Sequence, residues 1–537
     1  MNIFQNLQGF NFLEGFFAST PLLISYAEIH FHLKYLYPKY YMKEPEIITD
    51  IPIRIIKNKN RTIPLIIIVK DANLFPVTIN SVNISIEVND KMISKNFIIK
   101  KEISDKYFSQ ILDVDVKELE TNQFLQIIAK LDVEINGKSK IIINDNFPDI
   151  PRKPYKTFYA KEPLPLPESW YAGEPHYHSI HTADQVEFGA DVKSTAKLAK
   201  AMGLSWLFIT DHSYDLDDSI ISCTKNDADL PIWKHMLKDV KEYNSNELRI
   251  IPGEEVSIGN SKGENVHMLA INHNEFIDGY GDSAEKWFKN KPQHFLTEIN
   301  KLHKESNLFI AAHPIEKIPF MQKLTLRRGN WRDEDYQTSG IKFLQIINSA
   351  EPDNVKRSLN YWKKMLLKGN KYYLIAGNDA HGNFNVMRQI KSPFWKLFSS
   401  QKQVFGQFFT AYKYKENQPV AGLKNGEIIV SNGPFLSFQL KIKDEYFPIG
   451  STCKTDKVNL IIESETAIEF GEITNISIFI GDYNSGKEIE ITKQKNNCEI
   501  DLPEEGYVRM SLKTENGGVV FTNPVWIEKV KNSTQRH

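Results

Sequence analysis

Histidine and acidic side chains recur in short motifs across the middle of the chain, and their types suit metal binding. His176 and His178 lie two residues apart in GEPHYHS, and Asp379 and His381 have the same spacing in GNDAH. Residues i and i+2 of a strand point to the same side, so each pair can present two donors to one ion, with Tyr177 facing away. Neutral imidazole suits Zn, Fe and Mn-type ions, and carboxylates favour the harder ones.

Histidines at the ends of further apolar runs extend this set. Six candidates lie at or near the end of a predicted strand: His176, His178, His212, His267, His313 and His381. In parallel α/β folds, ligands bind beyond the carboxyl ends of the strands, so residues far apart in the sequence can converge. Six unrelated structural histidines would need six coincidences of placement. We therefore interpret the set as one metal centre, in which Glu255 and Asp379 are the natural bridges between ions.

The pair His30 and His32 in EIHFH has the same spacing in a different context. No other metal-type motif surrounds it in the N-terminal region. We interpret this pair as the polar face of an edge strand. The metal prediction therefore rests on the ordered series of motifs and not on the HxH spacing alone.

Alternating elements are expected to position these ligands. Seven apolar runs between residues 169 and 435 predict strands: YAGEPHYHS, WLFIT, ELRIIPGEEV, VHMLAIN, LFIAAHP, FLQIINSAE and YYLIAGNDAH. Between them lie helical patterns such as DVKSTAKLAKAMG, with an acidic start and a terminal glycine. Strands that alternate with helices indicate parallel βα units. We predict an α/β region that closes as a seven-stranded βα barrel.

The flanking regions have a different pattern. Short runs rich in Ile and Val, broken by Asn, Asp, Gly and Pro, predict an N-terminal β-sandwich-like domain over residues 1–147. Six prolines predict an extended linker over 148–168. The run-and-turn pattern returns over 436–530 and predicts a smaller C-terminal all-β domain. The two β domains are expected to flank the barrel.

Composition narrows the classes of protein. The formal net charge is −1, so no global basic field favours nucleic acid or an anionic membrane. Three widely spaced cysteines argue against a disulfide scaffold and a thiolate metal site. The N-terminus lacks a signal-peptide pattern, and no apolar window is long enough for a membrane span. We expect a soluble, cytoplasmic protein; its oligomeric state is not encoded in any pattern we recognise.

The order of GEPHYHS, ITDHS, PGEEVS, HMLAI, AAHP and GNDAH resembles the polymerase and histidinol phosphatase (PHP) family, and within it the CehA/McbA-type branch of metal-dependent hydrolases. The matching motifs fall between residues 169 and 435, followed by the segment GLKNGEIIVSNGPFLSF. The resemblance implies a distorted seven-stranded βα barrel of the PHP type. It also implies two or three divalent metal ions, for which Zn, Mn and Fe are the candidates.

The resemblance also implies a ligand set for each ion. The first site would use His176, His178, Glu255 and Asp379; the second would share Glu255 and add His267 and His313; the third would use Asp184, His212 and His381. Glu255 fits the family's Gly-x-Glu pattern, whereas the period of a strand turns Glu254 to the other face.

The motifs depart from the family at one point. The usual Asp-Leu before the first histidine is replaced by Glu174-Pro175, and the proline removes a backbone donor at the strand. His181 is not expected to be a ligand and is assigned to substrate contact or support of a ligand. Asp211 is interpreted as a hydrogen-bond acceptor behind the ligands or as a helix cap.

Other polar residues near the strand ends have two open interpretations each. Asn348 and Glu351 in NSAEP either line the pocket or cap a loop. Three arginines in RRGNWRDED, Arg327, Arg328 and Arg332, either clamp a phosphate or form a solvated charged surface.

The function expected from this set is hydrolysis by a metal-activated water. Paired ions ~3.5–4 Å apart lower the pKa of a bridging water and polarise the scissile group. A phosphoester is the first substrate hypothesis, and a carbamate, ester or amide on the same site is the second. The catalytic candidates are Asp379 and three histidines that could protonate the leaving oxygen if not fully ligated: His267, His313 and His381. A non-catalytic module whose β domains bind a glycan or peptide is the third hypothesis.

Overall fold

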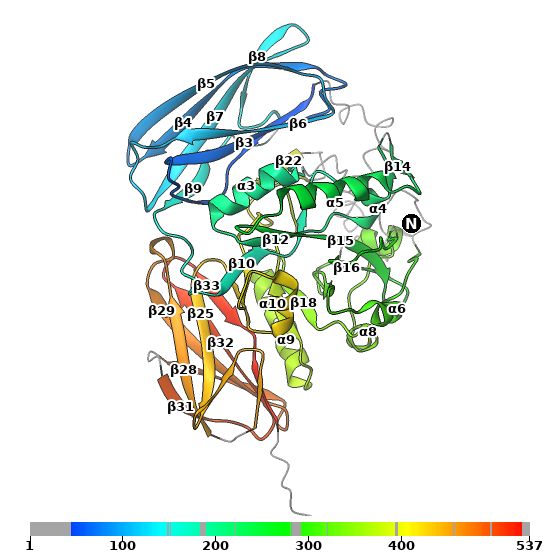
Figure 1. Cartoon of the computed structure of the whole chain (residues 1–537), viewed down its shortest axis with the longest axis vertical. Helices are drawn as coiled ribbons and strands as arrows, with labels where there is room; N and C mark the ends of the chain where they lie inside the picture. The colour runs from blue at the N-terminus through cyan, green and yellow to red at the C-terminus, as the bar shows by residue number, and fades with distance from the viewer. Residues whose placement is uncertain are drawn as a thin grey trace, which may run out of the picture.

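The structure is a computed structural model that describes residues 44–528, apart from 148–149, 151, 183–188, 221, 280, 282–290, 319, 392–395, 455–456 and 494–496. The described chain forms an N-terminal β region, a central α/β region and a C-terminal β region, stacked along the long axis of the molecule (Figure 1). None of the described helices has the length and apolar character needed to cross a bilayer.

The N-terminal region consists of two sheets. One contains β1 (Glu46–Asp50), β3 (Thr62–Lys70) and β6 (Tyr107–Asp115). The other contains β2 (Arg54–Ile56), β4 (Val77–Val88), β5 (Lys91–Ile103), β7 (Gln123–Ile135), β8 (Lys138–Ile143) and β9 (Tyr155–Ala160). Alternate residues of β7, such as Ile127 and Leu131, are buried in the cluster that also takes Ile67 of β3. This arrangement agrees with the predicted β-sandwich.

The segment predicted as a linker is partly a strand. β9 lies within 148–168 and pairs antiparallel with β7 and parallel with β2. The N-terminal sheets also pack against the central region, because Ile66 and Ile68 of β3 share a buried cluster with Leu198 of helix α3 (Val192–Met202). The sandwich and the central region therefore meet through an apolar interface.

The seven predicted central strands are present in one sheet. They are β10 (Trp170–Glu174), β12 (Trp206–Ile209), β15 (Arg249–Gly259), β16 (Asn265–Ile271), β17 (Leu308–Ala311), β18 (Phe343–Ile347) and β19 (Tyr373–Ala376). The main helices are α3, α5 (Pro231–Tyr243), α8 (Asp333–Ser339) and α9 (Pro352–Leu367), with shorter turns at α4 (Ser213–Leu216), α6 (Leu296–Ile299), η2 (Asn300–Leu302), α7 (Phe320–Thr325) and α10 (Pro419–Asn425). Asp191 caps α3 by accepting from Ser194 N, and Gly203 ends it at φ 90°, as its sequence predicted.

The prediction of an α/β fold built on a closed seven-stranded βα barrel is wrong. Of the described residues, 45% are in strands and 16% in helices, and their strands close no barrel. The edge of β10 that would close the ring on β19 pairs antiparallel with β23 (Phe409–Lys413) instead. The units are not uniformly parallel either, because β16 pairs antiparallel with both β15 and β17. The central sheet is therefore open and mixed.

The sheet continues into the C-terminal region. From β23 it passes through β24 (Ile428–Ser431) to β33 (Val519–Thr522), β32 (Gly506–Thr514), β29 (Ile473–Asp482) and β30 (Lys487–Lys493), with β27 (Thr452–Cys453) and β34 (Val525–Ile527) at one side. A second sheet contains β25 (Phe435–Ile442), β26 (Glu445–Pro448), β28 (Lys457–Glu465) and β31 (Asn497–Asp501), and η3 (Ile468–Phe470) lies between strands. The C-terminal region is all-β as predicted, and its main sheet crosses the predicted boundary at residue 435.

Three two-stranded ladders complete the described fold. They are β13 (Asp218–Ser219) with β14 (Ser222–Asn226), β21 (Met387–Lys391) with β22 (Lys396–Ser400), and β11 (Tyr177–His178) with β20 (Ala380–His381). Pro175 separates β10 from β11, so β11 leaves the main sheet and pairs parallel with β20. This last ladder brings the first and last predicted motifs together.

Candidate metal centre

The β11–β20 ladder sets the two histidine motifs side by side. His178 pairs in register with His381, and their rings stack with centroids 4.0 Å apart. His176 Nε2 lies 3.0 Å from His178 Nε2, whereas the Tyr177 hydroxyl turns away to Thr195 Oγ1 at 2.8 Å. The two histidines thus share one face of the strand, as their spacing predicted.

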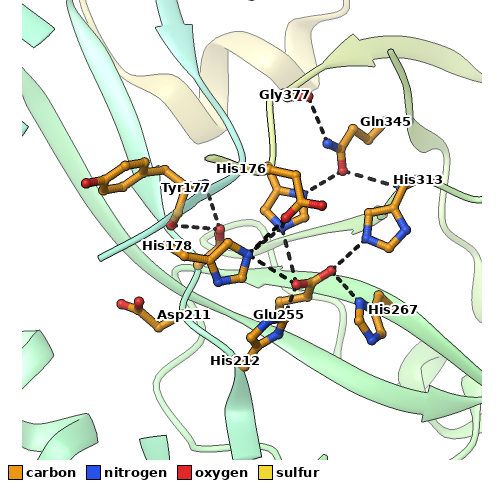
Figure 2. Close-up of polar contacts among 12 residues, drawn as sticks. His176, Tyr177, His178, Asp211, His212, Glu255, His267, His313, Gln345 and Gly377 are labelled. Carbon is orange, nitrogen blue, oxygen red and sulfur yellow. Dashed lines mark hydrogen bonds and ion pairs between the residues drawn. The ribbon is translucent and has the colours of Figure 1, made fainter. Parts of the chain in front are cut away.

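The Glu255 carboxylate lies at the middle of the centre, and its two oxygens face different groups (Figure 2). Oε2 lies 3.4 Å from His176 Nε2, 3.3 Å from His178 Nε2 and 3.1 Å from His212 Nδ1. Oε1 lies 2.7 Å from His267 Nδ1 and 2.9 Å from His313 Nε2. One carboxylate therefore connects two sets of imidazoles.

Three groups of donors each have the composition of a metal site. The first is His176, His178, Glu255 and Asp379; the second is Glu255, His267 and His313; the third is His178, His212 and His381. Within each group the donor atoms lie within 4.8 Å of one another. The first two groups consist of the residues that the family resemblance implied.

The donors fit divalent ions by their spacing and burial. Tetrahedral ligands ~2.1 Å from a common ion lie roughly 3.4 Å from one another. Asp379 Oδ1 lies 3.3 Å from His176 Nε2 and 3.2 Å from His178 Nε2, close to that separation. Glu255 Oε2 and His212 Nδ1 are buried and lie 3.1 Å apart, yet neither atom makes a well-aligned hydrogen bond among the described residues. Buried polar atoms without partners are costly, and an ion would satisfy both. The clusters could therefore hold metal ions.

The local backbone at two ligands is unusual. Asp379 has φ 51° and His313 has φ 26°, both in the left-handed region that non-glycine residues rarely adopt. Backbone strain of this kind persists where the surrounding structure holds it, and it clusters at functional sites. The Asp379 carboxylate lies 3.3 Å from His176 Nε2 and 3.2 Å from His178 Nε2.

Burial and charge act in opposite directions on the centre. Burial opposes ionisation of Glu255 and Asp379, yet neighbouring imidazoles, His176 among them, hold the pKa of both carboxyls well below the usual range. Burial also lowers the pKa of His176, but Asp379 and Glu255 outweigh it and raise that pKa to about 9. Burial and the nearby His178 lower the pKa of His212 to about 3. The carboxylates are therefore ionised and His212 is neutral, the states that ligands need, whereas His176 would have to release its proton to bind an ion.

Polar neighbours orient the ligating nitrogens. His176 Nδ1 donates to Gln345 Oε1 at 2.8 Å, which leaves Nε2 for the centre (Figure 2). His178 Nδ1 lies 3.3 Å from Thr182 Oγ1, and that hydroxyl donates to Asp211 at 2.9 Å. Asp211 also accepts from the backbone nitrogens of Ser179 at 2.6 Å and Thr182 at 3.0 Å. Asp211 is thus linked through Thr182 to His178, a candidate ligand.

Two further acidic residues, Glu254 and Glu174, lie near the centre but belong to none of the donor groups. Glu254 lies on the other face of β15 from Glu255 and accepts from Ser213 Oγ at 3.1 Å and Ile277 N at 3.0 Å. Glu174 accepts from the backbone nitrogens of His176 at 3.2 Å and Asn378 at 2.9 Å, and burial raises its pKa to about 7. Glu174 therefore joins β10 to the loop that carries Asp379.

The structure brings together eight of the nine predicted metal ligands: His176, His178, His212, Glu255, His267, His313, Asp379 and His381. The four residues proposed as catalytic are among them. The ninth, Asp184, lies outside the described residues, as do His30 and His32. His181 makes a 3.0 Å contact from Nε2 to Asp239 Oδ2 and belongs to none of the donor groups.

The arginines separate in space. Arg328 is largely buried, with its side chain 11% exposed, and places a guanidinium nitrogen 3.3 Å from His267 Nδ1, with Glu316 at 3.7 Å. Arg332 pairs with Glu264 at 3.2 Å on the partly exposed surface. Arg328 is thus the arginine of this motif that lies beside the centre.

Sequence reasoning did not single out two glutamines. Gln345 bonds His176 and donates to the Gly377 carbonyl at 3.0 Å. Gln403 donates to Asp379 Oδ2 at 3.2 Å. Neither residue type is a usual metal ligand, so a ligand search passes over both; the one available signal is a polar residue inside the apolar run FLQII.

Comparison with known proteins gives no assignment. No family model matches the chain, and no curated protein matches it. Among solved structures, a β-glucuronidase from Parabacteroides merdae is 9% identical with a TM-score of 0.19, over 92% of this chain and 66% of its own. An exo-chitosanase from Amycolatopsis orientalis is 8% identical with a TM-score of 0.19, over 87% and 61%. A putative late embryogenesis abundant protein is 8% identical with a TM-score of 0.18, over 27% and 86%. Similarities this weak carry no argument about fold or function.

Proposed function

We propose that this protein is a hydrolase that uses two or three divalent metal ions, with a phosphoester as its substrate. The observation that carries the proposal is the Glu255 carboxylate, whose two oxygens face two separate sets of imidazoles. A carboxylate in this position suits a bridging ligand between paired ions. Such ions, when bound, activate a water and polarise the scissile phosphoryl group.

Two sets of residues would hold the ions. The first site would use His176, His178, Glu255 and Asp379, and the second would use Glu255, His267 and His313. Mixed imidazole and carboxylate donors suit Zn, Mn and Fe. Hydrolysis forms a bond from the water oxygen to phosphorus and breaks the bond to the leaving alcohol, which takes up a proton.

Arg328 supports a substrate that carries negative charge. Its guanidinium lies beside His267, at the second donor group. Burial lowers the pKa of Arg328 to about 10, so the group stays charged at neutral pH. A buried guanidinium here would pair with a phosphoryl oxygen and hold the charge that grows in the transition state.

We also propose that the chain is related to the PHP family in the order of its ligand motifs. The two donor groups that match the implied ligand sets support this relation. The proposed relation concerns the order of the motifs and not the barrel fold.

Metal analysis followed by a substrate panel tests the function. Natively purified protein is expected to contain two or more equivalents of Zn, Mn or Fe, or to take them up after chelation. The reloaded protein is then assayed on aryl phosphates, aryl esters and aryl carbamates, and phosphate release is expected. Protein that holds less than one equivalent and gains none contradicts the proposal. Turnover of the ester or carbamate alone would leave the metal site and replace the substrate class.

A further inference from the structure

A cavity of about 260 Å³ opens beside the second donor group. One wall belongs to the centre itself: His313 is a predicted ligand, and Gln345 bonds His176. These two residues lie next to each other on one side of Glu255 (Figure 2). Gln403, which bonds Asp379, also lines the cavity. The cavity is therefore continuous with the proposed site of hydrolysis.

The wall away from the centre carries positive charge. Lys317, Arg357 and Lys402 line the cavity, against Glu316 and Glu351. Glu316 faces Arg328 and His313, at 3.7 and 3.4 Å. Once Glu316 is paired on the side of the centre, the outer wall has three cations and one carboxylate.

The remaining carboxylate, Glu351, forms an ion pair with Lys402 that an incoming anion can replace. Lys402 Nζ contacts Glu351 Oε1 at 2.8 Å, with side chains 52% and 38% exposed. Ion pairs this exposed contribute little, so an incoming anion competes with Glu351 for Lys402 at small cost. Arg357 donates to the neutral Asn354 Oδ1 at 2.9 Å and keeps its charge for a ligand.

The first turn of α9 faces the same cavity. Asn354, Arg357 and Ser358 all lie in this 16-residue helix and line the cavity. The first backbone N–H groups of a helix have no partner within it and favour a negative charge. The side chain of Glu351, at the N-cap position, makes no capping hydrogen bond. Pro352 has no N–H at the first helical position, and Glu351 and Asp353 already place negative charge at this helix end, so the attraction for an anion comes from the three cations.

We propose that the substrate carries a second anionic group, a carboxylate or phosphate, which binds between Arg357, Lys402 and Lys317 while the scissile phosphoester lies at the metal centre. This inference rests on the proposed function and narrows its substrate class to compact organic phosphates with two anionic ends. The cavity volume suits a small linker between the ends.

Non-hydrolysable phosphonates test the inference on the full-length, metal-loaded protein. The probes are phosphonoacetate, 3-phosphonopropionate and 4-phosphonobutyrate, each matched to an alkylphosphonate of the same chain length, and binding is measured by calorimetry. At least one carboxylated probe is expected to bind about tenfold more tightly than its alkyl match, because a charge-assisted pair with Arg357 adds to the phosphonate contact. Bisphosphonates of the same lengths distinguish a phosphate-binding site from a carboxylate-binding site.

Variants separate this cavity from general charge effects. Arg357→Gln and Lys402→Gln are each expected to remove most of the tenfold preference while leaving alkylphosphonate binding unchanged. Lys356→Gln is the matched control, since Lys356 is exposed on the same helix and does not line the cavity. If metal-bound protein binds each carboxylated phosphonate no more tightly than its alkyl match, this inference is refuted while the proposed function stands. Protein that takes up no metal refutes the proposed function, and the inference with it.

Discussion

At the scale of single residues, the charge of the centre depends on its two carboxylates. Glu255 and Asp379 lie among the imidazoles of at least five histidines and are buried or nearly so. Removing Glu255 takes a donor from two of the three groups, and removing Asp379 leaves Glu255 as the only carboxylate of the first group. The two residues are therefore more sensitive positions than any single histidine of the third group.

Asp379→Ala or His176→Ala is expected to abolish turnover and reduce metal content while the fold is retained. Each removes a donor from the group that shares Glu255 with the second site. The measurements are metal content and the phosphatase assay, with circular dichroism as the check of folding. The control is Asp353→Ala, an exposed acid in the first turn of α9. Full activity in either variant would disprove the ligand assignment.

Gln345→Ala tests the support behind the ligands. Without the Oε1 acceptor, the His176 ring loses the contact that fixes its tautomer, and metal affinity is expected to fall about 10–100-fold. Competition with a chromogenic chelator measures this change. Gln418→Ala, at an exposed glutamine, is the control. Unchanged affinity would mean that Gln345 only fills space in the buried strand.

At the scale of elements, Asp211 holds the loop after β11. It accepts from two backbone nitrogens and two hydroxyls of Ser179 and Thr182. Asp211→Ala leaves these buried donors without an acceptor, so the free energy of unfolding is expected to fall by roughly 3–5 kcal/mol. Urea unfolding measures it, with Asp211→Asn expected to fall in between and exposed Asp229→Ala as the control. A loss no greater than that of Asp229→Ala would contradict this role.

The sequence predicted types of element better than their partners. The Ile and Val runs and their alternation identified the strands, because burial of one face is a local property of each run. Whether β10 pairs with β19 or β23 depends on contacts between residues more than two hundred positions apart, which no local period encodes. The antiparallel pairing of β15 with β16 is local, because residues 260–264 join the two strands, and it was missed although this segment contains turn-forming residues. The candidate ligands lie close together as their motif order predicted, although the strands that carry them pair differently from the predicted barrel.

Within the centre, the type of side chain decided which residues could be predicted from the sequence. Histidine and acidic residues are recognisable as possible metal donors from their type, so nine candidate ligands could be chosen from the motifs. Gln345 and Gln403 act through amide groups that occur throughout proteins, and their role appears only when His176 and Asp379 lie beside them. The choice of Glu255 over Glu254 could be made from the sequence because strand geometry alone separates adjacent residues.

At the scale of the whole molecule, buried charges join the N-terminal sandwich to the central region. Asp50 at the end of β1 accepts from Phe384 N at 3.0 Å, and Arg388 in β21 contacts Asp145 at 3.1 Å and Asp50 at 3.9 Å. All three side chains are almost completely buried. The segment that follows the last ligand motif is therefore anchored on the sandwich.

This interface predicts a pH dependence of stability. Burial, opposed by Arg388, raises the pKa of Asp50 to about 6, above the ~3.9 of an unfolded aspartate. The folded protein thus binds the extra proton, and this contribution to stability is complete below about pH 4 and lost as the pH rises through 6. In urea unfolding from pH 4 to 7, the stability of wild type relative to Asp50→Asn is expected to fall by about 1–3 kcal/mol. Asp105→Asn, at an exposed position, is the control, and a difference for Asp50→Asn that stays constant with pH would contradict the prediction.

The sheet that runs from β19 through β10 and β23 to β30 has a consequence for how this protein can evolve. Its C-terminal strands do not form a separate domain on a flexible linker, because β33 pairs with β24 in the same sheet. A gene that lost everything after residue 435 would encode a chain with a raw, apolar strand edge, open to pairing with its own copies. Recombination in this lineage is therefore expected to keep the ligand-bearing segment and the C-terminal strands together as one heritable unit.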